Sequence, residues 1–220
     1  MRFHEVILAA GLSSRFGEKD ENKLLADLGG QPLYTHILER LIRVRDQRDD
    51  VDDLTIVCRP GNIYNVCRHD KRVICVENRH PEKGIASSLK IGLTTVGCLI
   101  AGQFRDYVRE KGQTVYTPLD DHHVLVCFVA DEPYLQEDTI NGFLDAFKES
   151  GKSMGAVSVN GRTCNPCCFR DDYWSALKEL GGDTGGKQLI RRHPEDVFLY
   201  ELPPEKAREV DDIDTKEDLC

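Results

Sequence analysis

The chain has 220 residues, of which 40% are hydrophobic and 30% are charged, and this composition excludes a globally disordered protein. Its 29 basic and 38 acidic residues give a formal net charge of −9, which argues against nucleic acid or an anionic membrane as a partner, because both require a positive field. We expect no apolar run as long as the roughly 18–20 residues of a membrane span, and no signal peptide. These features predict a protein of the cytoplasm.

Short apolar runs alternate with helical patterns along the chain, and this alternation predicts an α/β fold with a mostly parallel sheet and helices on both faces. The predicted strands are residues 6–10, 54–58, 73–76, 124–130 and 156–159. The predicted helices are residues 32–44, 87–96, 139–148, 172–180 and 186–192, with a further short helix after Gly61. Residues 97–121 have mixed charge and little periodicity, so we interpret them as an insertion within a single domain of residues 1–220.

The loop after the first predicted strand has a composition suited to binding phosphate. Its sequence over residues 8–17 is Leu-Ala-Ala-Gly-Leu-Ser-Ser-Arg-Phe-Gly, and Lys23 follows. Small residues let a ligand approach the backbone, while Arg15 and Lys23 supply charge for phosphate oxygens. The loop matches neither the Walker A pattern nor the dinucleotide fingerprint. From its residue types it is either a phosphate loop or an ordinary turn with solvated basic side chains.

Three aspartates stand where a carboxylate can serve either a ligand or the local backbone. Asp131 closes a very apolar strand, and the carboxyl ends of strands in open α/β sheets border the ligand crevice. A hard cation such as Mg²⁺ takes carboxylate and phosphate oxygens together, although Asp before Glu-Pro also suits a turn. Asp183, in a Gly-rich run, and Asp214, near the end of the chain, are equally suited to cap a helix.

Nine cysteines, an odd number, are scattered along the chain, and they favour a reducing compartment with mostly buried thiols. Cys164 and Cys167 have a Cys-x-x-Cys spacing, but a structural zinc site normally needs a second such pair, and the sequence has none. His122 and His123 precede the strand that ends near Asp131, so we expect them at the opposite end of the sheet as a surface pair.

Several short motifs occur in a fixed order along the chain. They are residues 8–17, Lys-Leu-Leu at 23–25, Gly-Gln-Pro-Leu at 30–33, Gly-Ile-Ala-Ser-Ser-Leu at 84–89, Val-Ala-Asp-Glu-Pro at 129–133, Asn-Pro at 165–166, the Gly-rich run at 180–185 and Asp-Ile-Asp-Thr at 212–215. In this order they resemble the MobA-like nucleotidyltransferases, and within them most closely the MocA-type molybdenum cofactor cytidylyltransferases. The resemblance implies a Rossmann-like α/β domain that transfers a nucleotidyl group from an NTP to a phosphorylated acceptor.

The same resemblance implies roles for particular residues. Arg15, Lys23 and Asp131 would be the catalytic residues, and Lys23 is preferred to Lys19 because Leu-Leu follows it, as in the family. The implied nucleotide-binding residues are Leu8, Ala9, Ala10, Gly11, Arg15, Lys23, Gly84, Ser88 and Asp131. The implied acceptor-binding residues are Asn165, Asp183 and Lys187, and the implied Mg²⁺ ligands are Asp131 and Asp214.

Ala-Ala-Gly in the first loop tends to accompany cytidylyl transfer in this family, whereas the guanylyl branch usually has Gly-Gly there. The resemblance therefore implies Mg²⁺-dependent transfer of CMP from CTP to molybdopterin or its molybdenum form, with pyrophosphate released and a recipient molybdoenzyme as a further partner. Two alternatives stay open. One is the same reaction with GTP or another phosphorylated acceptor. The other is a non-catalytic carrier of the cofactor, which the long segment before Lys23 and the predicted insertion favour.

Overall fold

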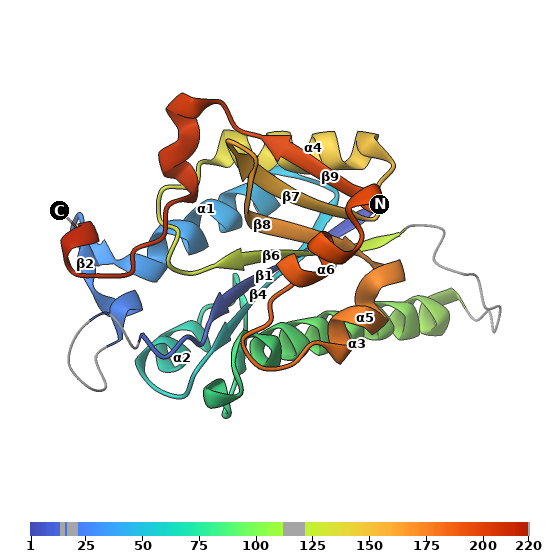
Figure 1. Ribbon diagram of the computed structural model, residues 1–220. Helices are drawn as coiled ribbons and strands as arrows, with labels where there is room; N and C mark the ends of the chain where they lie inside the picture. The colour runs from blue at the N-terminus through green and yellow to red at the C-terminus, as the bar shows by residue number, and fades with distance from the viewer. Residues whose placement is uncertain (14–15, 17–21, 112–121, 220) are drawn as a thin grey trace.

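The computed structural model describes residues 1–13, 16, 22–111 and 122–219, and Figure 1 shows their arrangement. Within these residues a seven-stranded sheet has the order β5-β4-β1-β6-β8-β7-β9. Its strands are β1 Arg2–Ala9, β4 Val51–Cys58, β5 Ile74–Glu77, β6 His123–Val129, β7 Met154–Val159, β8 Arg162–Arg170 and β9 Val197–Glu201. β8 runs antiparallel to β6 and β7, and the other pairs of this sheet are parallel. The predicted fold class is confirmed.

Helices and short turns connect the strands. The α-helices are α1 Leu33–Gln47, α2 Asn62–Cys67, α3 Ile85–Lys111, α4 Glu137–Ser150, α5 Trp174–Glu179 and α6 Lys187–Arg192. The 3₁₀ turns are η1 Lys23–Leu25, η2 Pro81–Lys83, η3 Asp171–Tyr173, η4 Pro194–Asp196, η5 Pro204–Val210 and η6 Glu217–Leu219. A small hairpin of β2 Asp27–Leu28 and β3 Gln31–Pro32 leads into α1.

Helices cover both faces of the sheet because alternate strand residues point to opposite faces. On one face, Phe3 and Ile7 of β1 belong to a buried cluster that includes Phe143 of α4 and residues of α1. On the other face, Val6 of β1 packs in a second cluster with Leu89 of α3 and residues of α5 and α6. Figure 1 shows α1 and α4 on one side of the sheet and α3 with α5 on the other.

Helix α3 is longer than the sequence pattern predicted. We expected a helix over residues 87–96 and an insertion from residue 97, but the helix continues to Lys111. The stretch Ile85–Gly102, with a mean hydropathy of 1.5, also passes the length and composition test for a membrane span, contrary to our expectation that no run would. Leu89, Leu93 and Val96 of this stretch are buried in the cluster on the sheet, so one face of the helix packs against the core.

Two strands of the seven-stranded sheet, β8 and β9, were not predicted from the sequence. β8 contains Pro166, and a proline argues against a central strand because it cannot donate to the ladder. The structure accommodates it through an irregularity, because the register with β7 shifts between Ala156 and Ser158 and residues 164–166 bulge out of the pairing. β9 lies at the edge of the sheet, and its five residues are half-buried or exposed.

The strand order fixes where a ligand can bind. β1 has β4 on one side and β6 on the other, and all three are parallel. The chain leaves β1 through α1 toward β4 and only later adds β6 on the opposite side, so it switches direction at β1. In open α/β sheets such a switch leaves a crevice outside the carboxyl ends of the strands. Gly11, after β1, and Asp131, after β6, follow the strands at this crevice.

His122 and His123 lie at the other end of the sheet, as expected, but they are not a surface pair. His122 is exposed, whereas His123 is only 8% exposed. His123 packs against the buried His4 of β1, with 2.8 Å between His123 Nδ1 and His4 Nε2. The sequence pattern gave no sign of this partner because it comes from a distant strand.

Candidate active site

A cavity of about 380 Å³ opens beyond the carboxyl ends of β1 and β6. This volume lies within the range of roughly 300–1,000 Å³ that is typical of small-molecule sites. The residues singled out from the sequence that line it are Leu8, Ala10, Gly11, Lys23, Gly84, Ser88, Asp131 and Asp183. Further lining residues come from the first loop, η1, η2 and the start of α3, namely Leu12, Ser13, Leu24, Pro81, Glu82 and Ile85, together with Val129 of β6.

A short 3₁₀ turn, η1, positions Lys23 in this cavity. Asn22 caps the turn, because its Oδ1 accepts a hydrogen bond from the backbone N–H of Leu24 at 3.2 Å. The backbone N–H of Lys23 itself donates to Ser13 Oγ at 3.2 Å, which ties the turn to the first loop. Leu24 is 4% exposed and anchors the turn in the core. The backbone of Lys23 is therefore fixed while its side chain reaches into the cavity.

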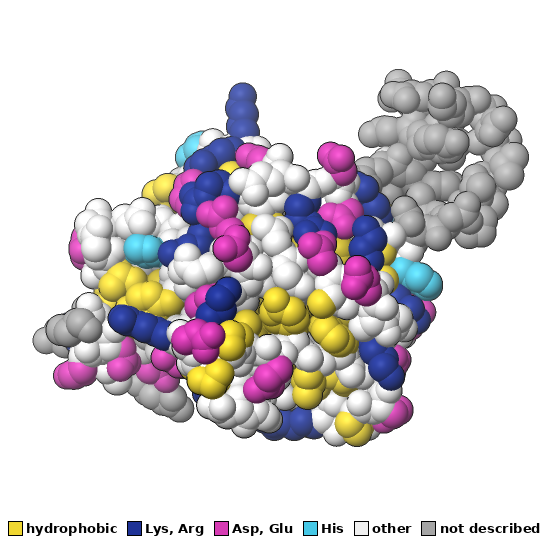
Figure 2. Space-filling view, turned by 90° about the horizontal axis from the view of Figure 1, so that it is seen from above, with side chains coloured by type: hydrophobic (Ala, Val, Ile, Leu, Met, Phe, Trp, Pro, Cys, Tyr) yellow, Lys and Arg dark blue, Asp and Glu magenta, His cyan; other side chains and the backbone are white. Residues whose placement is uncertain are grey.

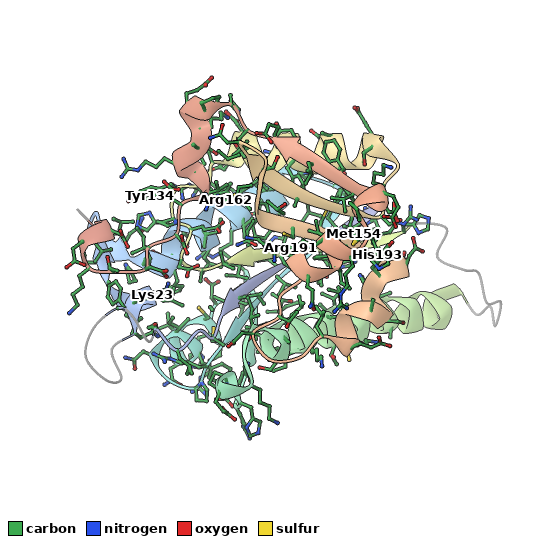
Figure 3. All side chains as sticks on the ribbon, in the orientation of Figure 1. Lys23, Tyr134, Met154, Arg162, Arg191 and His193 are labelled. Carbon is green, nitrogen blue, oxygen red and sulfur yellow. The ribbon has the colours of Figure 1, made fainter. Side chains whose placement is uncertain are left out.

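The Lys23 ammonium lies between two carboxylates. Its Nζ is 2.7 Å from Asp131 Oδ2 and 2.9 Å from Asp214 Oδ1. Burial by itself would lower the pKa of Lys23, but the charges and hydrogen bonds of Asp131 and Asp214 raise that pKa above its ordinary value. Lys23, which is labelled in Figure 3, is therefore a cation at neutral pH.

The end of the chain brings Asp214 to this place. The backbone N–H of Ile213 donates to the carbonyl oxygen of Asp131 at 2.9 Å, and the Ile213 side chain is 2% exposed. The carboxylate of Asp218 accepts from the backbone N–H groups of Asp214 and Thr215 at 3.0 and 2.7 Å. Asp218 thus serves the local backbone, and the Asp214 carboxylate pairs with Lys23.

Asp212 joins Asp131 and Asp214 in an acidic trio. One carboxylate oxygen of each residue lies within 4.8 Å of the other two. Sequence reasoning implied only Asp131 and Asp214, although the Asp-x-Asp spacing would have indicated that Asp212 and Asp214 share one side of an extended segment. An all-oxygen donor set of this kind suits a hard cation such as Mg²⁺ or Mn²⁺.

Gly84 forms part of the cavity wall at a position that excludes a side chain. Its φ is +80°, and a Cβ there would lie 2.4 Å from the carbonyl oxygen of Gly182 and 2.5 Å from Asp183 Oδ1. The backbone N–H of Ala86 donates to the Gly182 oxygen at 3.2 Å. The start of α3 and the Gly-rich run at 180–185 therefore pack backbone to backbone.

Asn78 holds the start of α3 against the sheet. Its Nδ2 donates to Ser87 Oγ at 2.7 Å and to Ser88 Oγ at 2.9 Å, and its backbone N–H donates to the Cys58 carbonyl oxygen at 2.7 Å. Asn78 is 1% exposed. Sequence reasoning singled out Ser88 but missed Asn78, which stands in a run of polar residues, 77–80, after the strand predicted at 73–76.

A second cavity of about 420 Å³ adjoins the first. The two share Leu8, Ile85, Val129 and Asp183. The residues implied for the acceptor, Asn165, Asp183 and Lys187, all line the second cavity. Arg191 of α6, labelled in Figure 3, adds a further cation to its wall. This cavity thus combines basic side chains with the apolar surface of Cys127, Cys167 and Phe169.

Glu132 is a buried carboxyl between the acidic trio and the second cavity. It is 5% exposed, and Asn165 Nδ2 donates to its Oε1 at 2.8 Å. Burial raises the pKa of Glu132 to about 8, against the opposing effect of the Asn165 hydrogen bond. Carboxyl groups with strongly shifted pKa values cluster at functional sites, and Glu132 contacts Asn165, which lines the second cavity. Sequence reasoning treated Glu132 only as a turn residue, because its burial depends on β8.

Some of the residues implied from the sequence do not reach the cavities. The side chain of Ala9 is 1% exposed and packs in the core cluster on the α1 face. Arg15 and Lys19 lie outside the described residues.

Asp183, which lines both cavities, does not cap α6. The N-cap of that helix is Gly186, so the helix-cap interpretation of Asp183 is wrong.

Solved structures share this fold. Rv0371c from Mycobacterium tuberculosis H37Rv has a TM-score of 0.66 and 20% identity, with 99% of this chain and 96% of that chain covered. A complex of Rv0371C with manganese has a TM-score of 0.61 and 16% identity, with 92% and 89% covered. The 4-diphosphocytidyl-2C-methyl-D-erythritol synthase of Anaerococcus prevotii DSM 20548 has a TM-score of 0.65 and 13% identity, with 99% and 92% covered. At these identities the likeness shows the fold.

The sequence, rather than the likeness in fold, identifies the family of this chain. No curated protein matches the chain. The family model for the MobA-like NTP transferase domain matches residues 5–197, which include the first loop, Lys23, Asp131 and both cavities. The chain therefore belongs to the MobA-like NTP transferase domain family and is a nucleotidyltransferase of that type.

Proposed function

We propose that the protein transfers CMP from CTP to molybdopterin or its molybdenum form and releases pyrophosphate. The observation that carries this proposal is the position of Lys23 between Asp131 and Asp214 beyond the carboxyl end of β6. A fixed cation there offsets negative charge on phosphate oxygens, and carboxylates there hold a divalent cation. Transfer between two phosphates needs such charges and positioning rather than a protein nucleophile.

The choice of CTP is supported by the residues at the end of β1. Ala10 and Gly11 line the first cavity, so their backbone groups are open to a base and ribose. With Ala9 they form the Ala-Ala-Gly sequence that accompanies cytidylyl transfer in the resemblance described above. The structurally similar enzyme from Anaerococcus prevotii is a diphosphocytidyl-methylerythritol synthase by name, and this favours a cytidine nucleotide.

The choice of a phosphorylated acceptor is supported by the second cavity. Lys187 and Arg191 supply charge for a phosphate there, and Asn165 supplies an amide. Because the two cavities share Asp183 and part of β1 and β6, an acceptor phosphate in the second can approach the α-phosphorus of a nucleotide in the first. The apolar wall of Phe169 suits a flat ring system such as a pterin.

We propose Mg²⁺ as the cofactor. The oxygens of Asp131, Asp212 and Asp214 fit it, because Mg²⁺ prefers carboxylate and phosphate oxygens. Manganese in the structurally similar Rv0371C supports a divalent cation of this class. When bound, such a cation neutralises phosphate charge and orients the triphosphate.

In the proposed reaction an oxygen of the acceptor phosphate attacks the α-phosphorus of CTP. The bond from that phosphorus to the oxygen that bridges it to the β-phosphorus breaks, and pyrophosphate leaves with the electron pair. Lys23 turns from the carboxylates to the phosphate oxygens and stabilises the charge on the leaving group, assisted by Arg15. Lys187 and Arg191 hold the acceptor phosphate in line, which removes much of the entropic barrier.

The proposal is tested by pyrophosphate release with Mg²⁺, molybdopterin or its molybdenum form, and each NTP in turn. We expect release with CTP alone among the nucleotides. Lys23→Met and Asp131→Asn should lower turnover by at least about 100-fold, in the range of a lost charge-stabilising group. Lys83→Met is the matched control, because Lys83 is exposed on η2 at the rim of the cavity and should retain full turnover.

Other outcomes of this assay would support one of the alternative functions. Release with GTP moves the protein to guanylyl transfer, and release with a small sugar phosphate but not with molybdopterin identifies a different acceptor. Folded protein that binds nucleotide and molybdopterin but releases no pyrophosphate with any NTP supports the carrier. In that case a complex with a molybdoenzyme should form.

We also propose that the protein works in the cytoplasm and binds neither nucleic acid nor membranes. The described cysteines are free thiols, and most of them are buried, as a reducing compartment allows. The face in Figure 2 has basic and acidic side chains intermixed rather than a continuous basic patch.

A further inference from the structure

A second group of metal-ligating side chains lies at the amino ends of the strands, toward the N-terminus in Figure 1. It consists of His4, Asp52, Asp53 and His123, which we call the His4 cluster. His4 lies five residues before Ala9 in β1. At roughly 3.3 Å per residue, the cluster is about 16 Å from the end of β1 that borders the nucleotide cavity. It is therefore separate from the proposed active site.

An irregularity in β4 brings two consecutive aspartates to one histidine. Phe3 pairs with Val51 whereas His4 pairs with Asp53, so Asp52 is an extra residue in β4. Consecutive side chains of a regular strand point to opposite faces, but a bulge redirects them. As a result His4 Nδ1 lies 2.7 Å from Asp53 Oδ2, and His4 Nε2 lies 3.9 Å from Asp52 Oδ2.

His123, the first residue of β6, completes the cluster. Its Nδ1 lies 2.8 Å from His4 Nε2. One ligand atom each of His4, Asp52 and His123 lies within 4.8 Å of the other two. His4 is fully buried, His123 is 8% exposed and the Asp52 side chain is 9% exposed. Two buried imidazoles and one largely buried carboxylate, from three strands, thus converge on one point.

We propose that His4, His123 and Asp52 bind one transition-metal cation of the Zn²⁺ class. Two imidazole nitrogens and one carboxylate oxygen are a common donor set for zinc, with water in the fourth position. The same set is poor for Mg²⁺, which prefers oxygen ligands. This distinguishes the cluster from the acidic trio at the other end of the sheet.

Asp53 is a positioning residue for this metal. Its carboxylate on His4 Nδ1 holds the ring proton there and directs the lone pair of Nε2 toward His123 and Asp52. The ring nitrogens that are 2.8 Å apart need to separate only to about 3.3 Å, the spacing around a tetrahedral zinc at roughly 2.0–2.1 Å. Binding replaces the proton between the two rings, which is released to solvent.

The cation has a structural consequence. It links β4, β1 and β6 at their amino ends and offsets the charge of two adjacent aspartates, of which Asp52 also pairs with Arg2. Because it binds the folded chain, it raises stability by mass action.

The test is zinc binding by the full chain, measured by titration calorimetry in excess Mg²⁺, which occupies all-oxygen sites, and by metal analysis after dialysis. We expect one Zn²⁺ per chain. His123→Gln and Asp52→Asn should each weaken it by at least about 100-fold, and Asp53→Asn by about 10- to 100-fold, as expected for an outer partner. His122→Gln is the matched control, because His122 is exposed beside the cluster and should bind zinc normally.

These variants keep every cysteine, so zinc held by thiols would survive the substitutions and overturn the proposal. Folded wild-type protein that binds no zinc at micromolar concentration would also overturn it, as would an equal loss in His122→Gln. A crystal of wild-type protein soaked in zinc gives an independent answer if a variant does not fold. An anomalous peak between His4 Nε2 and His123 Nδ1 supports the site, and its absence at full soak refutes it.

Discussion

Replacing Gly84 by alanine probes the backbone contact between the start of α3 and the Gly-rich run at 180–185. Gly84 has φ +80° and ψ −179°, a conformation that is essentially restricted to glycine and costs another residue roughly 1–3 kcal/mol. The new Cβ would also lie 2.4 Å from the backbone of Gly182, which therefore has to move. That movement breaks the hydrogen bond from Ala86 N–H to the Gly182 oxygen, which contributes about 1 kcal/mol. We expect a total loss of about 2–4 kcal/mol.

Urea denaturation and thermal unfolding measure this loss, since each kcal/mol shifts the Tm of a chain of this size by about 2–4 °C. Gly97→Ala is the matched control, because Gly97 lies in α3 with nothing within 4 Å of a new Cβ. That control should gain about 0.5–1 kcal/mol from helix propensity. Because Asp183 lines both cavities, Gly84→Ala should also weaken nucleotide and acceptor binding. Wild-type stability in Gly84→Ala would refute the backbone contact.

The structure also predicts the direction of a stability change, the direction of a change in metal affinity and the order in which thiols react. Burial raises the pKa of Glu5, so the native state keeps a proton that the unfolded chain releases above about pH 4.5, and the stability of the protein falls as the pH rises from there. In urea denaturation, the stability of Glu5→Gln relative to wild type should therefore increase between pH 5 and 8. A stability difference that stays constant over this range contradicts the prediction. Lys23→Met removes the cation between Asp131 and Asp214. In an electron paramagnetic resonance titration, Mn²⁺ should therefore bind the nucleotide-free variant about 10-fold more tightly than the wild type. Weaker binding by the variant would show that the Lys23 charge does not oppose the metal. Among the described cysteines, Cys98 is the exposed one. When native protein is treated with an alkylating reagent, mass spectrometry should therefore find Cys98 modified first. Faster labelling of a buried thiol would count against the packing described.

The predicted strands and helices agree with the structure where burial is continuous. β1, β4 and β6 each have apolar runs that are buried on both faces, and such runs are visible in a sequence. β8 was missed because Asn165 and Pro166 interrupt it, and only pairing on both sides makes it a strand. The full length of α3 was missed because its second half has mixed charge and little apolar periodicity.

The candidate site was predictable where a motif is local. Lys23 and Asp131 follow a loop and a strand that could be recognised, and the structure brings them within 2.7 Å of each other. Glu132 and Asn78 could not be found in this way. The hydrogen bond of Glu132 comes from Asn165, 33 residues away in the sequence, and the burial of Asn78 depends on how β4 and α3 pack around it. A single sequence carries no direct signal of such partners.

The charge distribution explains how an acidic protein can bind a triphosphate. A net charge of −9 repels nucleotide at long range, so affinity has to come from close contacts at the cavity. Within about one Debye length, roughly 8–10 Å, the basic side chains at the cavities and the divalent cation proposed for the acidic trio would outweigh that repulsion. Lys23 alone cannot do so, because Asp131 and Asp214 already balance its charge. In the proposed reaction a divalent cation on the acidic trio shares these carboxylates and so makes Lys23 available to phosphate. We therefore expect the cation and the nucleotide to strengthen each other's binding.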